Sequence, residues 1–169
     1  MQVRHKSATV LTAVALGAIT ALAGTGSPAA AAPGNSYYHD FPGGVRALIS
    51  LPEQSLNSGN TWTLPNTAKL TLQANGKLKV ISTSGQVRFE TNAVGRNSQL
   101  RFQTDGNLVL YSADGVNRWS SRTGTTVCQG GQKVLSLQSD TNVVIYCRKP
   151  ALPGPSTYYP IWATNTADS

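Results

Sequence analysis

The sequence predicts an all-β domain built from three similar units around a pseudo-threefold axis. Three observations support this fold class: short runs of alternating polar and apolar residues, turn-prone dipeptides between them, and one pattern that occurs three times. After the first thirty-odd residues, Thr, Val, Ser, Asn and Gly are abundant and helix-favouring runs are nearly absent. The dipeptides Asn75-Gly76, Asp105-Gly106 and Asp114-Gly115 indicate tight turns between strands.

Residues 1–32 have the three regions of a secretory signal peptide. A basic start, Arg4-His5-Lys6, precedes an almost wholly small or apolar stretch over 8–23 and a run of small residues over 27–32. We therefore expect the signal to be removed and the mature protein to be secreted into the extracellular space. The apolar stretch is shorter than the about 20 residues that a membrane-spanning helix needs, and a retained anchor is the alternative. No later segment is expected to span a membrane.

The mature chain, from about Pro33, is long enough for a single domain with a real core. Residues 33–49 lie outside the repeats and are expected to form an N-terminal extension. Residues 50–169 form the repeated domain, and residues 56–62 are expected to open its first strand pair. Removal of Arg4 and Lys6 leaves twelve Lys and Arg against seven Asp and Glu, a net charge of +5. The cations are scattered, so nucleic acid is not an expected partner.

Two cysteines, Cys128 and Cys147, are present, and export would permit a disulfide between them. On the chain-entropy model such a bridge stabilises the fold by about 3 kcal/mol. A metal site is not expected, because His39 is the one imidazole of the mature chain and no paired ligand spacing occurs. No cofactor is expected either.

The repeated pattern starts with an alternating strand and continues into a turn. Its glutamines, Gln73, Gln103 and Gln138, are 30 and then 35 residues apart. The three copies are Leu70-Thr71-Leu72-Gln73-Ala74-Asn75, Leu100-Arg101-Phe102-Gln103-Thr104-Asp105 and Leu135-Ser136-Leu137-Gln138-Ser139-Asp140. One such unit could not bury its apolar face alone, whereas three facing one another can.

Each unit ends with an aromatic residue followed by small polar residues. These aromatic residues, Phe89, Trp119 and Trp162, are expected to fill the axis of the domain. The distance from Gln to the aromatic residue is 16 in the first two units and 24 in the third, so eight residues are inserted there. The insertion falls within 148–159, where three prolines and a glycine predict a surface loop.

A polar ladder follows the glutamine in two of the three units. It comprises Gln103, Asp105, Asn107, Val109 and Tyr111 in the second unit, and Gln138, Asp140, Asn142, Val144 and Tyr146 in the third. Alternation along a strand places these residues on one face, and sends Leu100, Phe102, Leu108 and Leu110, like Leu135, Leu137, Val143 and Ile145, into the core. The Asp-Gly step could perturb the alternation near Gln103.

The residue types of the ladder suit a neutral sugar. Two amides, a carboxylate and a phenol offer both donors and acceptors to neighbouring hydroxyls, and the valine offers an apolar contact to ring carbons. No metal is required. The structural alternative is that Gln, Asp and Asn hydrogen-bond the turn of each repeat, but two complete copies at the same spacing favour sugar binding.

The pattern Q-x-D-x-N-x-V-x-Y resembles the signature of the bulb-type (snowdrop-like, monocot) mannose-binding lectins, and residues 161–166 are similar to their closing segment. The resemblance covers about residues 50–169. It implies a β-prism II fold, with three four-stranded antiparallel sheets around a pseudo-threefold axis. It also implies binding of α-D-mannose, or of mannose-containing glycans on cell surfaces, without metal or catalysis.

The resemblance further implies a role for each ladder residue. Gln, Asp, Asn and Tyr of both copies would hydrogen-bond mannose hydroxyls, and Val109 and Val144 would pack on the ring carbons. Family members exchange their C-terminal strand between subunits, so exchange of residues 159–166 would give a homodimer. The cysteines depart from the usual family positions, and Cys147 directly follows Tyr146, so a bridge could stiffen the third-unit site.

The first unit departs from the ladder pattern. Its matching residues are Gln73, Asn75, Lys77, Lys79 and Ile81. A lost hydrogen-bond partner costs about 1–3 kcal/mol for a buried group, so several losses should silence a weak sugar site. We expect this unit to be structural or to have switched to an anionic partner.

Three other functions are the alternatives to a lectin. A glycosidase would need two carboxyl groups about 5–10 Å apart, but Asp105 and Asp140 belong to different repeats and no nucleophile motif is present. A lectin-like antibacterial or antifungal effector acting on cell-surface glycans would use the same fold. A purely structural surface protein would not need two complete ladders.

Overall fold

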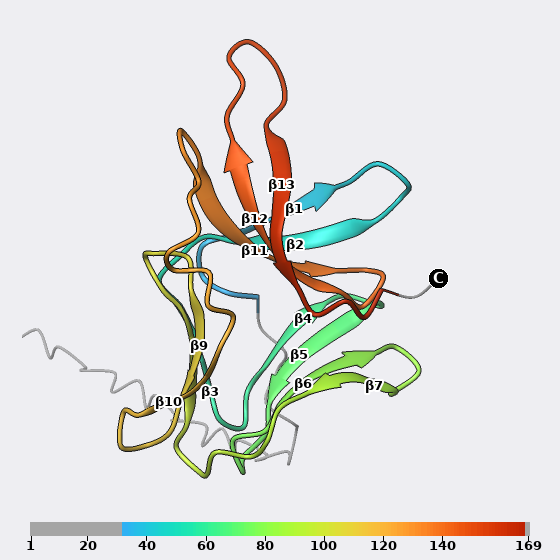
Figure 1. The fold of residues 1–169 in the computed structure, drawn as a ribbon. Helices are drawn as coiled ribbons and strands as arrows, with labels where there is room; N and C mark the ends of the chain where they lie inside the picture. The colour runs from blue at the N-terminus through green and yellow to red at the C-terminus, as the bar shows by residue number, and fades with distance from the viewer. Residues whose placement is uncertain (1–31, 168–169) are drawn as a thin grey trace, which may run out of the picture.

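A computed structural model describes residues 32–167, which form thirteen β-strands and no helix (Figure 1). The predicted signal peptide therefore lies almost wholly outside the described residues. Over that same range no helix is long and apolar enough to cross a membrane. The strands are β1 (Ser36–Asp40), β2 (Arg46–Ser50), β3 (Gln54–Asn57), β4 (Thr61–Leu64), β5 (Ala68–Leu72), β6 (Leu78–Ser82), β7 (Val87–Glu90), β8 (Gln99–Phe102), β9 (Leu108–Tyr111), β10 (Asn117–Ser120), β11 (Gln132–Gln138), β12 (Val143–Lys149) and β13 (Thr157–Ala163).

Three antiparallel sheets face a common interior, as Figure 1 shows. The first has the order β4-β5-β6-β7, the second β10-β9-β8-β3 and the third β1-β2-β11-β12-β13. The prediction of an all-β prism of the β-prism II type is confirmed. The third sheet has five strands where the resemblance implied four, because β1 is added beyond β2.

Each unit supplies three consecutive strands of its sheet. The N-terminal segment, residues 36–64, precedes the first unit and supplies a fourth strand to every sheet. In chain order, β2 pairs with β11, β3 with β8 and β4 with β5. The segment 33–49, expected to be a separate extension, thus contributes β1 and β2 to the third sheet. Residues 56–62 do not open one strand pair, because β3 and β4 belong to different sheets.

The main core lies between the inner faces of the three sheets. Alternation along each strand sends its leucines, valines and isoleucines there, as predicted for the second and third units. The four inward residues of the second unit, Leu100, Phe102, Leu108 and Leu110, are at most 1% exposed. Leu135, Leu137, Val143 and Ile145 of the third unit belong to the same cluster.

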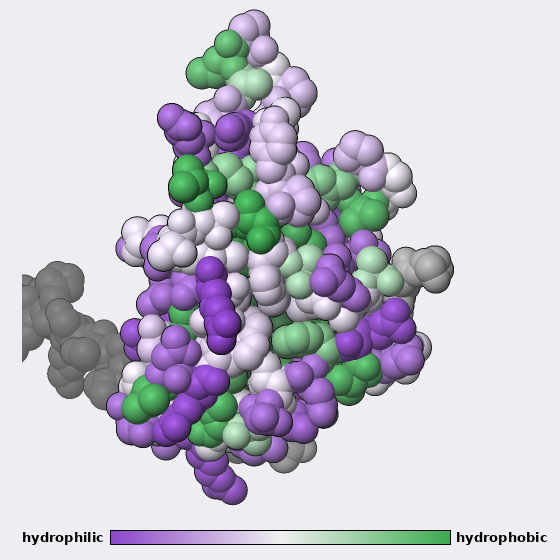
Figure 2. Space-filling view, viewed as in Figure 1, coloured by the Kyte–Doolittle hydropathy of each residue, from purple (hydrophilic) through white to green (hydrophobic). Residues whose placement is uncertain are grey.

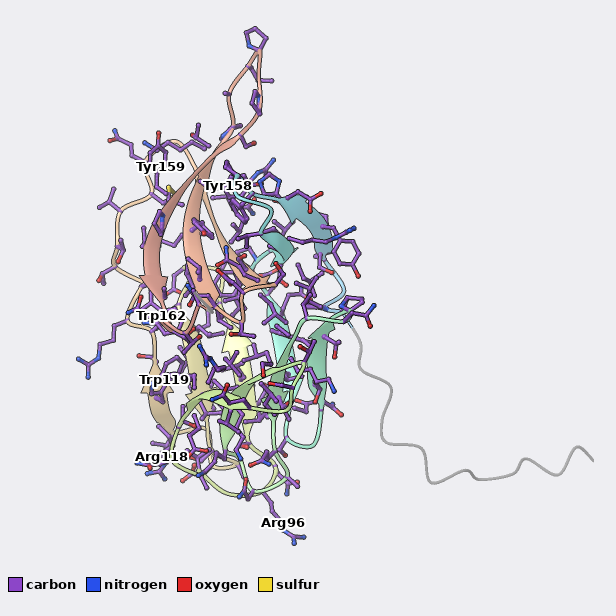
Figure 3. All side chains as sticks on the ribbon, turned by 90° about the vertical axis from the view of Figure 1, so that its right-hand side faces the viewer. Arg96, Arg118, Trp119, Tyr158, Tyr159 and Trp162 are labelled. Atoms are coloured by element: carbon purple, nitrogen blue, oxygen red, sulfur yellow. A yellow bond between two sulfur atoms is a disulfide. The ribbon has the colours of Figure 1, made fainter. Side chains whose placement is uncertain are left out.

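The three unit-closing aromatic residues meet at the axis, as predicted. Trp119 contacts Phe89 on one side and Trp162 on the other, edge to face, with ring centroids 6.0 and 5.8 Å apart. All three rings pack against the main core. Figure 3 labels Trp119 of β10 and Trp162 of β13, which lie one above the other.

The small polar residues after each aromatic residue close the unit. In every unit a backbone N–H of the middle strand donates to a hydroxyl two residues beyond the aromatic ring. The donors and acceptors are Leu78 and Thr91 at 3.2 Å, Leu108 and Ser121 at 3.0 Å, and Val143 and Thr164 at 3.0 Å. This shared contact explains why the sequence repeats Thr or Ser at that position.

The predicted insertion lengthens a hairpin that projects from the prism (Figures 1 and 2). β12 and β13 have seven residues each, whereas their counterparts β9 and β10 have four. Leu152, in the connecting loop, is 95% exposed. The predicted disulfide between Cys128 and Cys147 is present and ties the segment before β11 to β12.

Candidate functional site

The second-unit ladder, defined as Gln103, Asp105, Asn107, Val109 and Tyr111, spans a hairpin rather than one strand. Gln103 N–H donates to Asn107 O at 2.9 Å, and Gly106 N–H donates to Gln103 O at 2.8 Å. Gly106 has a φ of +76°, a left-handed conformation that favours glycine. The alternation is therefore interrupted at the Asp105-Gly106 step, the position where the sequence allowed for a perturbation, although both arms of the hairpin still present their ladder residues on one face.

Asp105 and Asn107 each use one oxygen to hold this turn. Asp105 Oδ1 accepts the backbone N–H of Asn107 at 2.9 Å. Asn107 Oδ1 accepts the Ser121 hydroxyl at 3.0 Å and the Thr123 N–H at 3.2 Å. The turn-binding alternative is thus correct for these atoms. The atoms left to meet a ligand are Asp105 Oδ2, which no described residue contacts by a hydrogen bond, and Asn107 Nδ2.

Gln103 and Tyr111 meet across the hairpin, where Gln103 Nε2 donates to the Tyr111 hydroxyl oxygen at 3.0 Å. Gln103 Oε1 is then left as an acceptor and the Tyr111 O–H as a donor. Together with Asp105 Oδ2 and Asn107 Nδ2, the ladder offers two acceptors and two donors on one face. Adjacent sugar hydroxyls, each of which donates and accepts, match this set.

Val109 has little surface to offer a ligand, since it is 1% exposed. Arg101 is its cross-strand partner, and the Arg101 guanidinium lies over the Tyr111 ring, 5.3 Å from the ring centroid. The arginine side chain therefore crosses the ladder beside Val109. Sequence reasoning missed Arg101, although its place two residues before Gln103 on an alternating strand puts it on the ladder face.

Two hollows flank the second-unit ladder. Asp105 and Thr104 line one of about 540 Å³, together with Lys133 and Glu53. Tyr111 and Arg101 line the other, of about 310 Å³. Lys133 Nζ also donates to Asp105 O at 2.7 Å, so a cation of the third sheet supports the hairpin. A glycan longer than one sugar has room to continue from either end of this ladder.

The third-unit ladder, defined as Gln138, Asp140, Asn142, Val144 and Tyr146, repeats this geometry. Gln138 Nε2 donates to the Tyr146 hydroxyl at 2.9 Å, and Asn142 N–H donates to Asp140 Oδ1 at 3.0 Å. Thr141 stands where the second unit has Gly106 and has a φ of +65°, unusual for a β-branched residue. The internal hydrogen bonds of the two ladders are therefore the same.

An aromatic cluster, defined as Tyr37, His39, Phe41, Tyr146 and Tyr158, includes the tyrosine of the third-unit ladder. Phe41 stacks on Tyr146 with centroids 5.1 Å apart, and Tyr158 meets Tyr146 edge-on at 5.9 Å. Burial raises the pKa of Tyr146 above 10.0, and the hydrogen bond from Gln138 partly offsets this rise. The Tyr146 hydroxyl is therefore neutral at physiological pH. The Tyr146 ring is already in contact with Phe41 and Tyr158.

The cluster exists because the third sheet curves. β1 and β13 are its opposite edges, yet the hydroxyls of Tyr37 and Tyr158 lie 3.2 Å apart. Burial, and next the hydrogen bond with Tyr158, raise the pKa of Tyr37. Ala47, Ile49 and Val134 form a small second core beneath these rings. No local sequence pattern joined the N-terminal aromatic residues to Tyr146, which lies about a hundred residues further along.

The first unit keeps the turn but not the ladder. Lys77 N–H donates to Asn75 Oδ1 at 3.1 Å, the same turn that Asp105 makes. Lys77 and Lys79 both pair with Glu90, at 3.1 and 3.7 Å. The hydrogen bond from Lys77 lowers the pKa of the Glu90 carboxyl. Glu90 thus partly neutralises the two lysines that replaced the motif residues.

The residues that the structure describes contain no group of three His, Cys, Asp or Glu side chains that could hold a metal ion.

The chain is similar to known carbohydrate-binding proteins. No family model matches it. A mannose-specific lectin from Aloe arborescens is 38% identical over 89 residues, which are 52% of this chain and 70% of that lectin. The fold is similar to that of monomeric monocot mannose-binding lectins from Gastrodia elata, with 29% identity and a TM-score of 0.54 over 72% of this chain and 98% of theirs. A Marasmius oreades lectin, 23% identical, shares the fold with a TM-score of 0.55 over 69% of this chain and 89% of its own.

Proposed function

Since the chain belongs to the bulb-type, monocot mannose-binding lectin family, we propose that it binds mannose-containing glycans through the second-unit ladder. The observation that supports this site best is that four polar groups of the ladder remain available to hydrogen-bond a ligand after the internal hydrogen bonds are formed. Gln103 Oε1 and Asp105 Oδ2 are acceptors, whereas Asn107 Nδ2 and the Tyr111 O–H are donors. Their positions are held by the hairpin before any ligand arrives, which limits the entropy lost on binding.

The third-unit ladder is the second site of this proposal, and it differs in access. Its hydrogen bonds match those of the second unit, but Phe41 stacks on Tyr146. Because Phe41 lies against one face of the Tyr146 ring, a sugar at this ladder would have to contact or displace Phe41. We therefore assign mannose binding in the folded protein chiefly to the second unit.

The proposed activity is binding alone, without catalysis. A single shallow sugar site has a dissociation constant on the order of 1 mM, about −4 kcal/mol, so useful binding requires several contacts at once. A polymeric mannan, which presents many residues to many copies of the protein, meets this condition. Incubation with mannan should release no reducing sugar, and a time-dependent release would contradict the proposal.

Substitution of one carboxylate in each ladder tests the assignment. Asp105→Asn removes the charge but keeps the turn acceptor, as Asn75 does in the first unit. We expect this variant to lose about tenfold or more in binding to immobilised mannan, because one hydrogen bond of this kind contributes about 1–3 kcal/mol. Asp140→Asn is the matched control and should change binding by less than about threefold.

Circular dichroism and thermal unfolding of both variants would confirm that the fold is kept. Equal losses in the two variants would show that both ladders bind mannan in the folded protein. Undiminished binding by the double variant would overturn the assignment of the ladders.

We also propose that the protein is secreted. Residues 1–32 support export, and the mass of the protein recovered from culture medium, lower by that segment, is the measurement that checks it. β13 pairs with β12 along the edge of the third sheet, and this is the strand that an exchange would replace with its counterpart from a second copy. The homodimer formed by strand exchange stays a prediction, which light scattering of the purified protein would test.

A further inference from the structure

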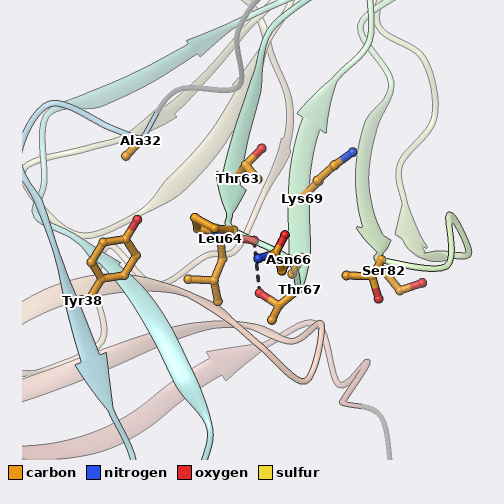
Figure 4. A pocket seen from close by; sticks show the side chains of 11 residues that line it. Ala32, Tyr38, Thr63, Leu64, Asn66, Thr67, Lys69 and Ser82 are labelled. Carbon is orange, nitrogen blue, oxygen red and sulfur yellow. Dashed lines mark hydrogen bonds between the residues drawn. The ribbon is translucent and has the colours of Figure 1, made fainter.

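The first unit has a polar pocket that the ladders do not use. It has a volume of about 620 Å³, within the range of about 300–1,000 Å³ typical of small-molecule sites. It lies at the end of the first sheet opposite the Asn75 turn, where β4, β5 and β6 approach β1. Figure 4 shows Tyr38 of β1 on one side and Thr63, Lys69 and Ser82 on the other.

This pocket differs from the degenerate ladder of the same unit in whether its lysine is paired with a carboxylate. Lys77 and Lys79 share Glu90, so their charges are partly neutralised. Lys69 lines the pocket, and no Asp or Glu of the described residues pairs with it or lines the pocket beside it. The neighbouring Arg46 is paired with Asp40 at 3.9 Å. The unneutralised positive charge of this face therefore belongs to Lys69.

The neutral groups around Lys69 are those that sugar hydroxyls and a sugar ring require. Thr63 Oγ1 is buried and has no hydrogen-bond partner among the described residues, which is costly unless a ligand supplies one. Tyr38 is 50% exposed, and the Arg46 guanidinium lies 5.0 Å from its ring centroid. The ring also borders the pocket, where it can meet the apolar face of a pyranose.

We propose that this pocket is a further carbohydrate site, independent of the two ladders, which binds a sugar bearing a negative charge. Lys69 pairs with the anionic group, Thr63 hydrogen-bonds a hydroxyl and Tyr38 packs on the ring. The anionic group is a carboxylate or a phosphate, since an ammonium pairs with either. The site does not rest on mannose binding by the ladders, because it shares no residue with them.

Two probes distinguish the sources of the charge: a galacturonate oligomer supplies carboxylates and mannose 6-phosphate supplies a phosphate. Each probe is titrated into the purified protein and the binding heat is measured by calorimetry. The affinity should fall as the salt concentration rises from about 0.05 to 0.5 M. Lys69→Gln should weaken binding about tenfold or more, and Thr63→Val several-fold. Lys77→Gln is the matched control, since Lys77 is paired with Glu90, and should change affinity less than about twofold.

Binding of either probe that depends on Lys69 supports the site and identifies its anion. The proposal is overturned if neither probe binds, or if Lys69→Gln and Lys77→Gln weaken binding equally. Mannan binding measured on the same samples tests the ladders separately from the pocket. Retained mannan binding with no anionic-sugar binding refutes the pocket alone, and the reverse result refutes the ladder assignment alone.

Discussion

Asp105 depends on a glycine in a different part of the chain. A Cβ built on Gly124 would lie 2.5 Å from Asp105 Oδ2 and 3.5 Å from Asn107 Cβ. Gly124 follows Thr123, whose N–H donates to Asn107 Oδ1. The bare backbone at Gly124 therefore leaves the carboxylate the room it occupies, although Gly124 is not part of the Q-x-D-x-N-x-V-x-Y pattern.

Gly124→Ala should weaken mannan binding about tenfold, because the added methyl group displaces the Asp105 carboxylate from the ladder. Stability should change little, since the methyl group displaces one exposed side chain. Surface plasmon resonance on immobilised mannan, with thermal unfolding alongside, measures both effects. Gly34→Ala is the control, because its Cβ would meet only Gln54 Oε1, at 3.8 Å. Unchanged binding by Gly124→Ala would show that Asp105 is not needed in its present position.

The β1–β2 hairpin is the element that makes the third unit different from the second. Phe41 lies in the turn between these strands and stacks on Tyr146, while His39 and Tyr37 contact Tyr158. The second sheet ends at β3 and has no such hairpin. One added strand pair thus changes the accessibility of a ladder whose own hydrogen bonds are intact.

Phe41→Ala should uncover the third-unit ladder and raise the number of methyl-α-mannoside molecules bound per chain from one to two. The lost ring contacts should destabilise the fold by about 1 kcal/mol. Amide chemical shifts of β9 and β12 during a titration report the two ladders separately. Phe41→Tyr keeps the ring and should leave the third ladder silent. A Phe41→Ala protein in which β12 does not respond would show that Tyr146 is not limited by Phe41.

The part of this arrangement that sequence predicts is the part encoded locally. Alternation and turn dipeptides indicated the strands, the inward faces and the two ladders, because these depend on residues a few positions apart. The placement of β1 and β2 depends on pairing with β11, about ninety residues away, and no local pattern records it. For the same reason Phe41 and Gly124 were missed as neighbours of the ladders, whereas Arg101, two residues before Gln103, could have been placed by alternation. The hairpin turn inside the second-unit ladder was signalled by Asp105-Gly106, whereas the same turn at Thr141 in the third unit had no such signal.

The whole molecule is held together at its axis, where the aromatic residues of all three units meet. Trp119 is the central ring and contacts both Phe89 and Trp162.

Trp119→Ala should lower the free energy of unfolding by about 3 kcal/mol, the lower end of the range for a large aromatic residue, because Trp119 is only partly buried. Urea unfolding should remain a single transition. Tyr159→Ala, at a side chain that is 52% exposed, should change stability by less than about 1 kcal/mol. Equal losses in the two variants would contradict a central role for the axis.

The strands contributed by the N-terminal segment determine when the molecule can fold. β2, β3 and β4 leave the ribosome first, but β2 finds its partner β11 only after most of the chain has followed. The first sheet, built from residues 61–90, can form early, whereas the third sheet stays incomplete until β13 has emerged. Such a high contact order slows folding and keeps unpaired strand edges exposed until the last unit emerges. The folded prism is therefore pseudo-symmetric, but its sheets form in an unequal order, because β2 near the start of the chain stays unpaired until β11 has been synthesised.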